Sequence, residues 1–80
     1  LKLHIDGGTD LTLPSGGYLM VGPADGANIS MDNNEIMSKN NGTTSPLHIN
    51  REGGNTLFNE LSGNVGIGTN TPTSSLCILV

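Results

Sequence analysis

Short sets of apolar residues at every second position, each closed by a turn sequence, restrict this chain to few folds. An alternation of period two places each set on one face of a short β-strand. The sets are Leu1/Leu3/Ile5, Leu11/Leu13, Leu19/Val21, Ile29/Met31, Leu47/Ile49, Val65/Ile67 and Leu76/Ile78/Val80. The stretches DGG, PSGG, GPADG, KNNG, REGG and TNTP separate them and favour turns. The sequence therefore predicts an all-β fold.

No window has the i, i+3, i+4 spacing of an amphipathic helix. The stretch DNNEIMSK, residues 32–39, comes nearest to it, but its two asparagines and the NNG that follows favour a turn. The segments LHIDGG (3–8) and LHINREGG (47–54) resemble each other. Because the spacing of such segments along the chain is irregular, it predicts no ladder of fixed-length coils.

The chain has few large apolar side chains with which to build a core of its own. It has 80 residues, with one Phe, one Tyr and no Trp. A chain of this length buries only about 60% of its unfolded surface. Cys77 is the single cysteine, so no internal disulfide is possible, and two distant histidines, His4 and His48, form no structural zinc set. Oligomerisation is the remaining source of stability, and the sequence predicts a multi-chain assembly.

The distribution of charged and apolar residues excludes two classes of partner, nucleic acid and the membrane interior. The formal net charge is −4, and the only cations are Lys2, Lys39 and Arg51, so no basic stripe is available for nucleic acid. No apolar run is long enough to insert into a membrane. Both ends lie within apolar stretches, and we therefore expect the chain to be a fragment of a longer protein.

The stretch GNVGIGTNTP, residues 63–72, has the composition of a structural motif. Its glycines do not follow the G-x-G-x-x-G order of a phosphate loop, and no helix follows them. Alternation places Val65 and Ile67 on one face and the side-chain-free Gly66 and Gly68 on the other, where another backbone can approach closely. Pro72 ends pairing and turns a corner.

Two segments resemble phage tail fibres and related bacterial surface fibres. SGNVGIGTNTPTSSL (62–76) is similar to their GNVGIGT-x-x-P-x-x-x-L signature, and NEIMSKNNGTTSPLHINREGGN (34–55) is similar to a recurring upstream segment. The chain departs from the pattern at its end, where SSLCILV replaces a typical SKLHV. The resemblance divides the chain into residues 1–33, a shaft segment without a signature, and residues 34–80, a tail-fibre-like segment.

The resemblance implies an elongated, intertwined homotrimeric β-fibre in a virion, and thus an extracellular, structural protein without enzymatic activity. Its partners would be other tail or baseplate proteins and a host glycan or protein receptor. The motif residues would be Gly63, Val65, Gly66, Ile67, Gly68 and Pro72. A single-chain β-solenoid or small β-sandwich is the alternative fold. The alternative functions are a subunit of a bacterial surface filament and a fragment of a glycan-cleaving tailspike.

The candidate contact surface is DNNEIMSKNNGTT, residues 32–44, because loops carry binding function on rigid β-scaffolds. The receptor-contact candidates within it are Asn34, Lys39, Asn40 and Asn41. We predict no catalytic residue, no metal ligand and no cofactor. Two histidines, His4 and His48, are expected to be exposed, and no pair stands out among the carboxylates that a glycosidase would need. Those carboxylates are Asp25, Asp32, Glu35, Glu52 and Glu60. The final strand is apolar on both faces, so a neighbouring chain or domain is expected to cover Cys77.

Overall fold

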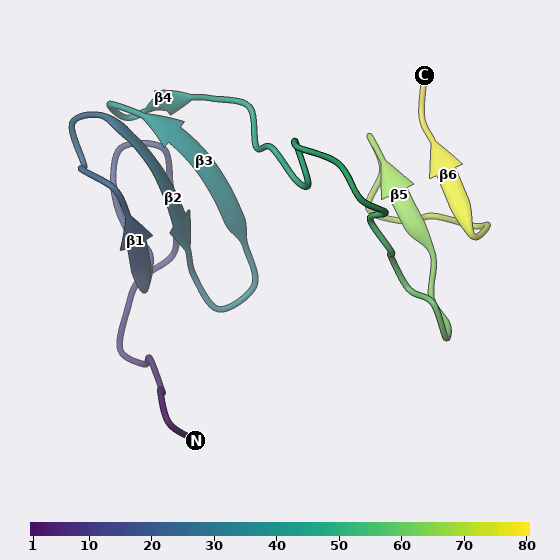
Figure 1. Ribbon diagram of the computed structural model, residues 1–80, viewed down its shortest axis with the longest axis horizontal. Helices are drawn as coiled ribbons and strands as arrows, with labels where there is room; N and C mark the ends of the chain where they lie inside the picture. The colour runs from purple at the N-terminus through teal and green to yellow at the C-terminus, as the bar shows by residue number, and fades with distance from the viewer. The chain divides into compact units, whose positions relative to one another are not determined.

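The computed structural model describes residues 1–80 and is all-β, with six strands in two small sheets and no helix (Figure 1). The all-β prediction is therefore confirmed. No helix is present that could cross a bilayer. The chain divides into two units, Leu1–His48 and Ile49–Val80. The two units meet between residues 48 and 49. The boundary between residues 33 and 34 in the sequence analysis marks instead where the resemblance to tail fibres begins.

Unit 1 contains an antiparallel sheet of order β1-β2-β3-β4. Its strands are β1 (Leu19–Val21), β2 (Ala27–Met31), β3 (Ile36–Asn40) and β4 (Thr43–Thr44). The sequence favoured a turn over residues 32–39. Residues 32–35 do turn, with the Asp32 amide bonded to the Glu35 carbonyl at 3.1 Å, but residues 36–39 belong to the strand β3, so for them the prediction was wrong. All five residues of β3 pair with β2, from Ile36 opposite Met31 to Asn40 opposite Ala27. Pairing with an adjacent strand overrides weak local preference.

The sheet of unit 1 is inverted with respect to polarity. Its register places Leu19 opposite Met31 and Val21 opposite Ile29, so the apolar sets share one face, as alternation predicted. That face is exposed: the exposed fractions are 36% for Leu19, 62% for Val21 and 39% for Ile29. The opposite face carries Asn28, Ser30 and Lys39, which are 5%, 0% and 3% exposed. It also carries two methionines opposite or beside Ser30, Met20 at the edge strand, which is 39% exposed, and the half-buried Met37. The sheet thus buries the polar side chains of one face and leaves apolar side chains of the other face exposed.

A hydrogen-bonded network satisfies the buried polar face. Ser30 Oγ donates to Asn28 Oδ1 at 2.9 Å, and Asn28 Nδ2 donates to the carbonyls of Pro23 at 3.0 Å and Gly26 at 3.2 Å. No buried side-chain polar atom lacks a partner. Leu11 is the one buried large apolar residue of the chain. Complete satisfaction of this kind is what allows polar groups to be buried.

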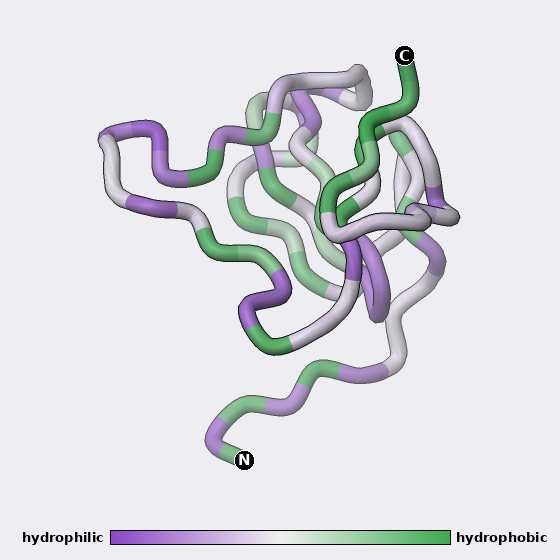
Figure 2. Tube along the Cα trace, turned by 90° about the vertical axis from the view of Figure 1, so that its right-hand side faces the viewer, coloured by the Kyte–Doolittle hydropathy of each residue, from purple (hydrophilic) through white to green (hydrophobic).

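Unit 2 is built around two short parallel strands, β5 (Val65–Ile67) and β6 (Leu76–Ile78), with Val65 opposite Leu76 and Ile67 opposite Ile78. None of its residues is buried. The hydropathy trace in Figure 2 shows the hydrophobic end of the chain that follows β6. A two-stranded sheet with no covered face is marginal by itself.

Three expected strands do not form. Residues 1–5, 11–13 and 47–49 lie outside the strands, so these predictions were wrong. Alternation fixes which face a side chain would occupy, but a strand also needs a neighbouring edge with which to pair. No edge of the chain pairs with these segments.

The structure reveals a repeat that the sequence analysis did not predict. Asn41, Asn50 and Asn59 are the only non-glycine residues with positive φ, at 49°, 53° and 52°, and they are nine residues apart. Gly68, nine residues further on, also has positive φ, at 75°. Asparagine tolerates this left-handed conformation better than most residues. Asn50 and Asn59 share one kind of turn, each with a positive-φ glycine four residues later, whereas Asn41 and Gly42 form the two-residue turn between β3 and β4.

Candidate functional site

The four residues predicted to contact a receptor do not come together. Asn34 lies in the connection before β3, whereas Asn40 ends β3 and Asn41 follows it. A strand of five residues spans about 17 Å. Asn34, Asn40 and Asn41 are exposed, but they occupy opposite ends of β3 and line no common pocket.

Lys39, which the sequence analysis predicted to contact a receptor, is buried. Its side chain is 3% exposed, and its Nζ donates to the carbonyl oxygen of Thr12 at 3.2 Å. Lysine is almost never fully buried without a partner. This contact joins the 11–15 segment to the polar face of the sheet, which gives Lys39 a structural role.

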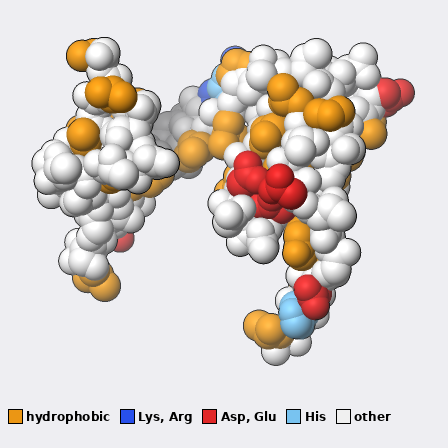
Figure 3. Space-filling view, turned by 180° about the vertical axis from the view of Figure 1, so that it is seen from behind, with side chains coloured by type: hydrophobic (Ala, Val, Ile, Leu, Met, Phe, Trp, Pro, Cys, Tyr) orange, Lys and Arg blue, Asp and Glu red, His pale blue; other side chains and the backbone are white.

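A cluster of three carboxylates forms beside the β2–β3 connection, and the sequence analysis did not anticipate it. Asp10, Asp32 and Glu35 each place an oxygen within 4.8 Å of the others. The surface view shows one larger patch of acidic side chains, with other acidic side chains apart from it (Figure 3). Asp32 and Glu35 lie on the same turn, but Asp10 is 25 positions from Glu35, so only folding brings Asp10 to the cluster.

Hydrogen bonds within the cluster separate the pKa values of two of its members. The backbone amides of Asn34 and Leu11 donate to Asp32 Oδ1 at 2.9 Å and Oδ2 at 3.0 Å, and they lower the pKa of this carboxyl to about 2. Hydrogen bonding to Asp32, with desolvation, raises the pKa of Glu35. Because both Asp32 oxygens already accept backbone amides, the cluster holds the Leu11 segment against the β2–β3 connection, and we assign it no catalytic or metal-binding role.

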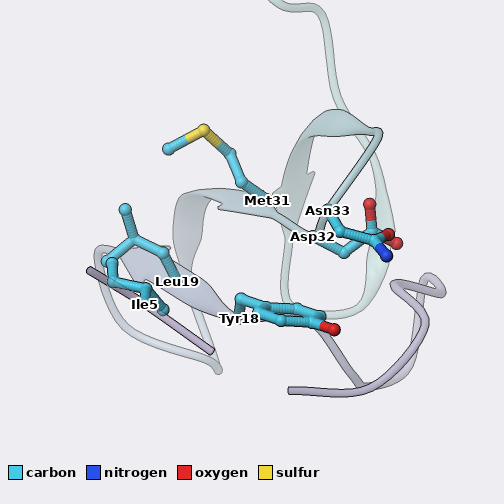
Figure 4. Close-up of a pocket in the computed structure, with 6 residues that line it drawn as sticks. All are labelled: Ile5, Tyr18, Leu19, Met31, Asp32 and Asn33. Atoms are coloured by element: carbon cyan, nitrogen blue, oxygen red, sulfur yellow. The ribbon is translucent and has the colours of Figure 1, made fainter. Parts of the chain in front are cut away.

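One pocket of about 230 Å³ opens on unit 1 (Figure 4). Tyr18 lies between the aliphatic Ile5 and Leu19 on one side and the polar Asp32 and Asn33 on the other, with Met31 above. Its volume is below the range of about 300–1,000 Å³ that is usual for ligand sites. Leu19 and Met31 belong to the exposed apolar face, so the pocket is a hollow in that face.

The GNVGIGTNTP residues form β5 and the corner after it. Gly63 and Gly68 have positive φ, at 101° and 75°. A Cβ at Gly66 would lie 2.5 Å from the carbonyl oxygen of Thr69, so the backbone that comes close to Gly66 belongs to the same chain. The carbonyl of Pro72 accepts a hydrogen bond from Asn64 Nδ2 at 3.1 Å. The motif thus builds a strand and its closing turn.

The remaining candidates stay at the surface. His4 and His48 are exposed, as expected. Asp6 Oδ1 accepts the amide of Gly7 at 2.9 Å. Cys77 is half-buried on β6 between the exposed Leu76 and Ile78.

No protein-family model, curated protein or solved structure matches the chain.

Proposed function

We propose that this chain is a structural segment of a bacteriophage tail fibre, assembled as a homotrimer that supports attachment to the host cell. The observation that carries the proposal is the inverted sheet of unit 1. On one face Asn28, Ser30 and Lys39 are buried and Lys39 is bonded to Thr12 of the 11–15 segment, whereas Leu19, Val21 and Ile29 on the other face are open. Contiguous exposed apolar surface marks an interaction site. The proposal covers this face with other copies of the chain.

The exposed area supports an assembly. The chain has an accessible surface of 6524 Å². Compact monomers of 8.2 kDa expose about 4,500 Å², and two separate compact pieces of 48 and 32 residues would together expose about 5,400 Å². The accessible surface of the chain exceeds both values, so this excess of exposed area does not depend on how the two units are placed. Eighteen large apolar side chains are exposed and one, Leu11, is buried.

The trimer and the virion location rest on the resemblance of residues 34–55 and 62–76 to tail-fibre segments. The short strands, the glycine and asparagine turns and the net charge of −4 agree with that resemblance. The proposal includes no catalytic residue. Partners would be other tail or baseplate proteins and a host receptor.

Measurement of the mass in solution tests the proposal. At micromolar concentration we expect three times the chain mass of 8.2 kDa. Replacement of Ile29 by lysine on the apolar face should yield a monomer, because a charge cannot be buried there without a partner. The matched variant Thr44→Lys, at an exposed polar position of β4, should remain trimeric. A stable monomer of the unmodified chain would overturn the proposal.

Electron microscopy of the assembled protein separates the proposal from its nearest alternative. Shafts of finite length are expected for a virion fibre, and open-ended polymers would instead indicate a bacterial surface filament. New reducing ends after incubation with host polysaccharide would favour a glycan-cleaving tailspike.

A further inference from the structure

Residues 50–67 of unit 2 contain two tandem nine-residue repeats, NREGGNTLF and NELSGNVGI. Asn50 and Asn59 have φ of 53° and 52°, and four residues later Gly54 and Gly63 have φ of 97° and 101°. Each asparagine donates its Nδ2 to the carbonyl five residues on, at 3.0 Å in both repeats. The two repeats therefore share the positive-φ positions and the asparagine side-chain bond, although the bond from the Gly53 amide to the Asn50 carbonyl occurs only in the first.

The residues that follow the two turns differ in their pairing. After the second turn, Val65–Ile67 form β5 and pair with β6. After the first turn, the equivalent residues 56–58 make no backbone hydrogen bond within the chain. Leu57 and Phe58 are 65% and 60% exposed. Residues 56–58 thus occupy a strand position without a partner.

Strand β5 has one free edge. The Val65 amide donates to the Ser75 carbonyl at 2.9 Å, and the Leu79 amide donates to the Ile67 carbonyl at 2.8 Å, so the polar groups of Val65 and Ile67 face β6. Backbone groups of successive strand residues point to opposite edges. The N–H and C=O of Gly66 therefore face the other edge, where no strand of the chain lies.

The chain cannot readily fill this edge itself. Parallel strands need a connection of about a dozen residues or more. The connection between β5 and β6, residues 68–75, is already short, and only residues 59–64 separate residues 56–58 from β5. Those six residues are also occupied by the Asn59 turn, whose side chain is bonded to Asn64. A neighbouring copy has no such restriction.

We propose that residues 56–58 of one copy pair in parallel with the free edge of β5 in a neighbouring copy, with Leu57 opposite Gly66. The Gly66 amide then donates to the Thr56 carbonyl, and the Gly66 carbonyl accepts the Phe58 amide. Phe58 lies beside Ile67, and both exposed apolar side chains become covered. The inference rests on the proposed homotrimer and names its contact: each copy gives one strand and receives one, which closes a ring under three-fold rotation.

The charge distribution favours a second copy as the partner. Residues 50–67 contain only Arg51, Glu52 and Glu60 as charged groups. The other acidic residues of this chain lie before residue 41: Asp6, Asp10, Asp25, Asp32 and Glu35. Copies with a net charge of −4 can therefore meet along this segment with little like-charge repulsion.

Amide hydrogen exchange on the unmodified protein tests the pairing directly. We expect the Phe58 and Gly66 amides to exchange on the order of 100-fold more slowly in the assembled protein than in the dissociated chain. Fast exchange of both amides in a protein of trimer mass would overturn the pairing and leave the proposed fibre function standing. A monomeric mass would overturn both.

Cysteine crosslinking identifies which copies are joined. Two chains are prepared in a Cys77→Ser background, one with Phe58→Cys and one with Ile67→Cys, then mixed, assembled and oxidised. We expect a disulfide-linked dimer that contains one chain of each kind, and much less dimer from either variant alone. A double variant that closes the bond within one chain would overturn the pairing. If the substitutions prevent assembly, the exchange measurement decides.

Discussion

The two units of this chain hold their structures by different means. Unit 1 has an interior, although a mainly polar one, in which Asn28, Ser30 and Lys39 are buried with every side-chain polar atom paired. Unit 2 has no buried residue and is held by two parallel strand segments and by asparagine side chains bonded to backbone carbonyls. Unit 1 therefore closes one of its faces alone, whereas unit 2 closes none.

This difference shows where an assembly would contribute most. Hydrogen bonds add modestly to net stability, and most of the driving force for folding comes from apolar burial. Unit 1 lacks cover on one sheet face, and unit 2 lacks cover throughout. Substitutions at the buried polar residues of unit 1 should therefore have local effects. Substitutions on the apolar face of unit 1 or within unit 2 should have effects that are coupled to assembly.

The largest effect is expected for Lys39→Ala in unit 1. This substitution removes a buried side chain and leaves the Thr12 carbonyl without its donor, so we expect a loss of about 2–4 kcal/mol in the stability of unit 1. Amide exchange in β2 and β3 measures it, with amides of unit 2 as internal reference. Lys39→Met, which keeps most of the stem, should cost less.

Lys2→Ala is the matched control, because Lys2 is exposed, and it should change stability by less than about 0.5 kcal/mol. An equally small change for Lys39→Ala would contradict the structural role of Lys39. The result also bears on host attachment. Because Lys39 is buried, loss of adsorption in a Lys39 variant would report unfolding of unit 1 and would not identify Lys39 as a receptor contact. Asn40 and Asn41 variants test attachment without this complication.

A smaller effect is expected for Asn59→Ala in unit 2. Alanine loses the bond to the Asn64 carbonyl and is disfavoured at a φ of 52°, so we expect about 1–2 kcal/mol of destabilisation. Asn59→Gly restores the backbone conformation without the side-chain bond and should recover part of this loss. The protein concentration at half-dissociation of the assembly is the measurement. A change in unit 1 amides alone would contradict the assignment.

The alternation of apolar residues predicted part of this fold correctly. Leu19, Val21, Ile29 and Met31 lie on one face of a sheet, and Val65 and Leu76 begin paired strands. Alternation could not predict that the apolar face would be the open one, because this depends on the 11–15 segment, which covers the polar face. The contact between Lys39 and Thr12 spans 27 residues and has no local signature.

Other features had a signal in the sequence that was not used. Asn41, Asn50 and Asn59 are evenly spaced, and GN recurs at 54–55 and 63–64, so a search at a period of nine would have predicted the repeated turn. For the Asp10, Asp32 and Glu35 cluster no sequence signal existed for Asp10, which only the fold of unit 1 brings to the turn that carries Asp32 and Glu35. The receptor-contact residues were chosen as one loop, and strand β3 separates them.

The smallest effect is expected from acid, and it should be confined to unit 1, which contains both shifted carboxyls. The pKa of Asp32 is lowered from 3.8 to about 2, so its contribution to stability is present above pH 3.8 and is lost as the pH falls toward 2. The pKa of Glu35 is raised above 4.5, so its contribution has the opposite sign: it is present below pH 4.5 and is lost as the pH rises through the raised pKa.

Glu35→Gln separates the two contributions. The neutral amide does not repel Asp32, so unit 1 should be slightly more stable at pH 7, and its remaining acid dependence should follow Asp32 alone. Asp25→Gln, at an exposed turn outside the cluster, is the control. Carboxyl-carbon NMR titration of the unmodified chain should show Asp32 titrating near pH 2 and Glu35 above 4.5. If both carboxyls titrated together near pH 4, the Leu11 and Asn34 amides would not be bonded to Asp32 in solution. Unit 1 would then lack one of the contacts by which it closes a face without a partner, and it would differ less from unit 2.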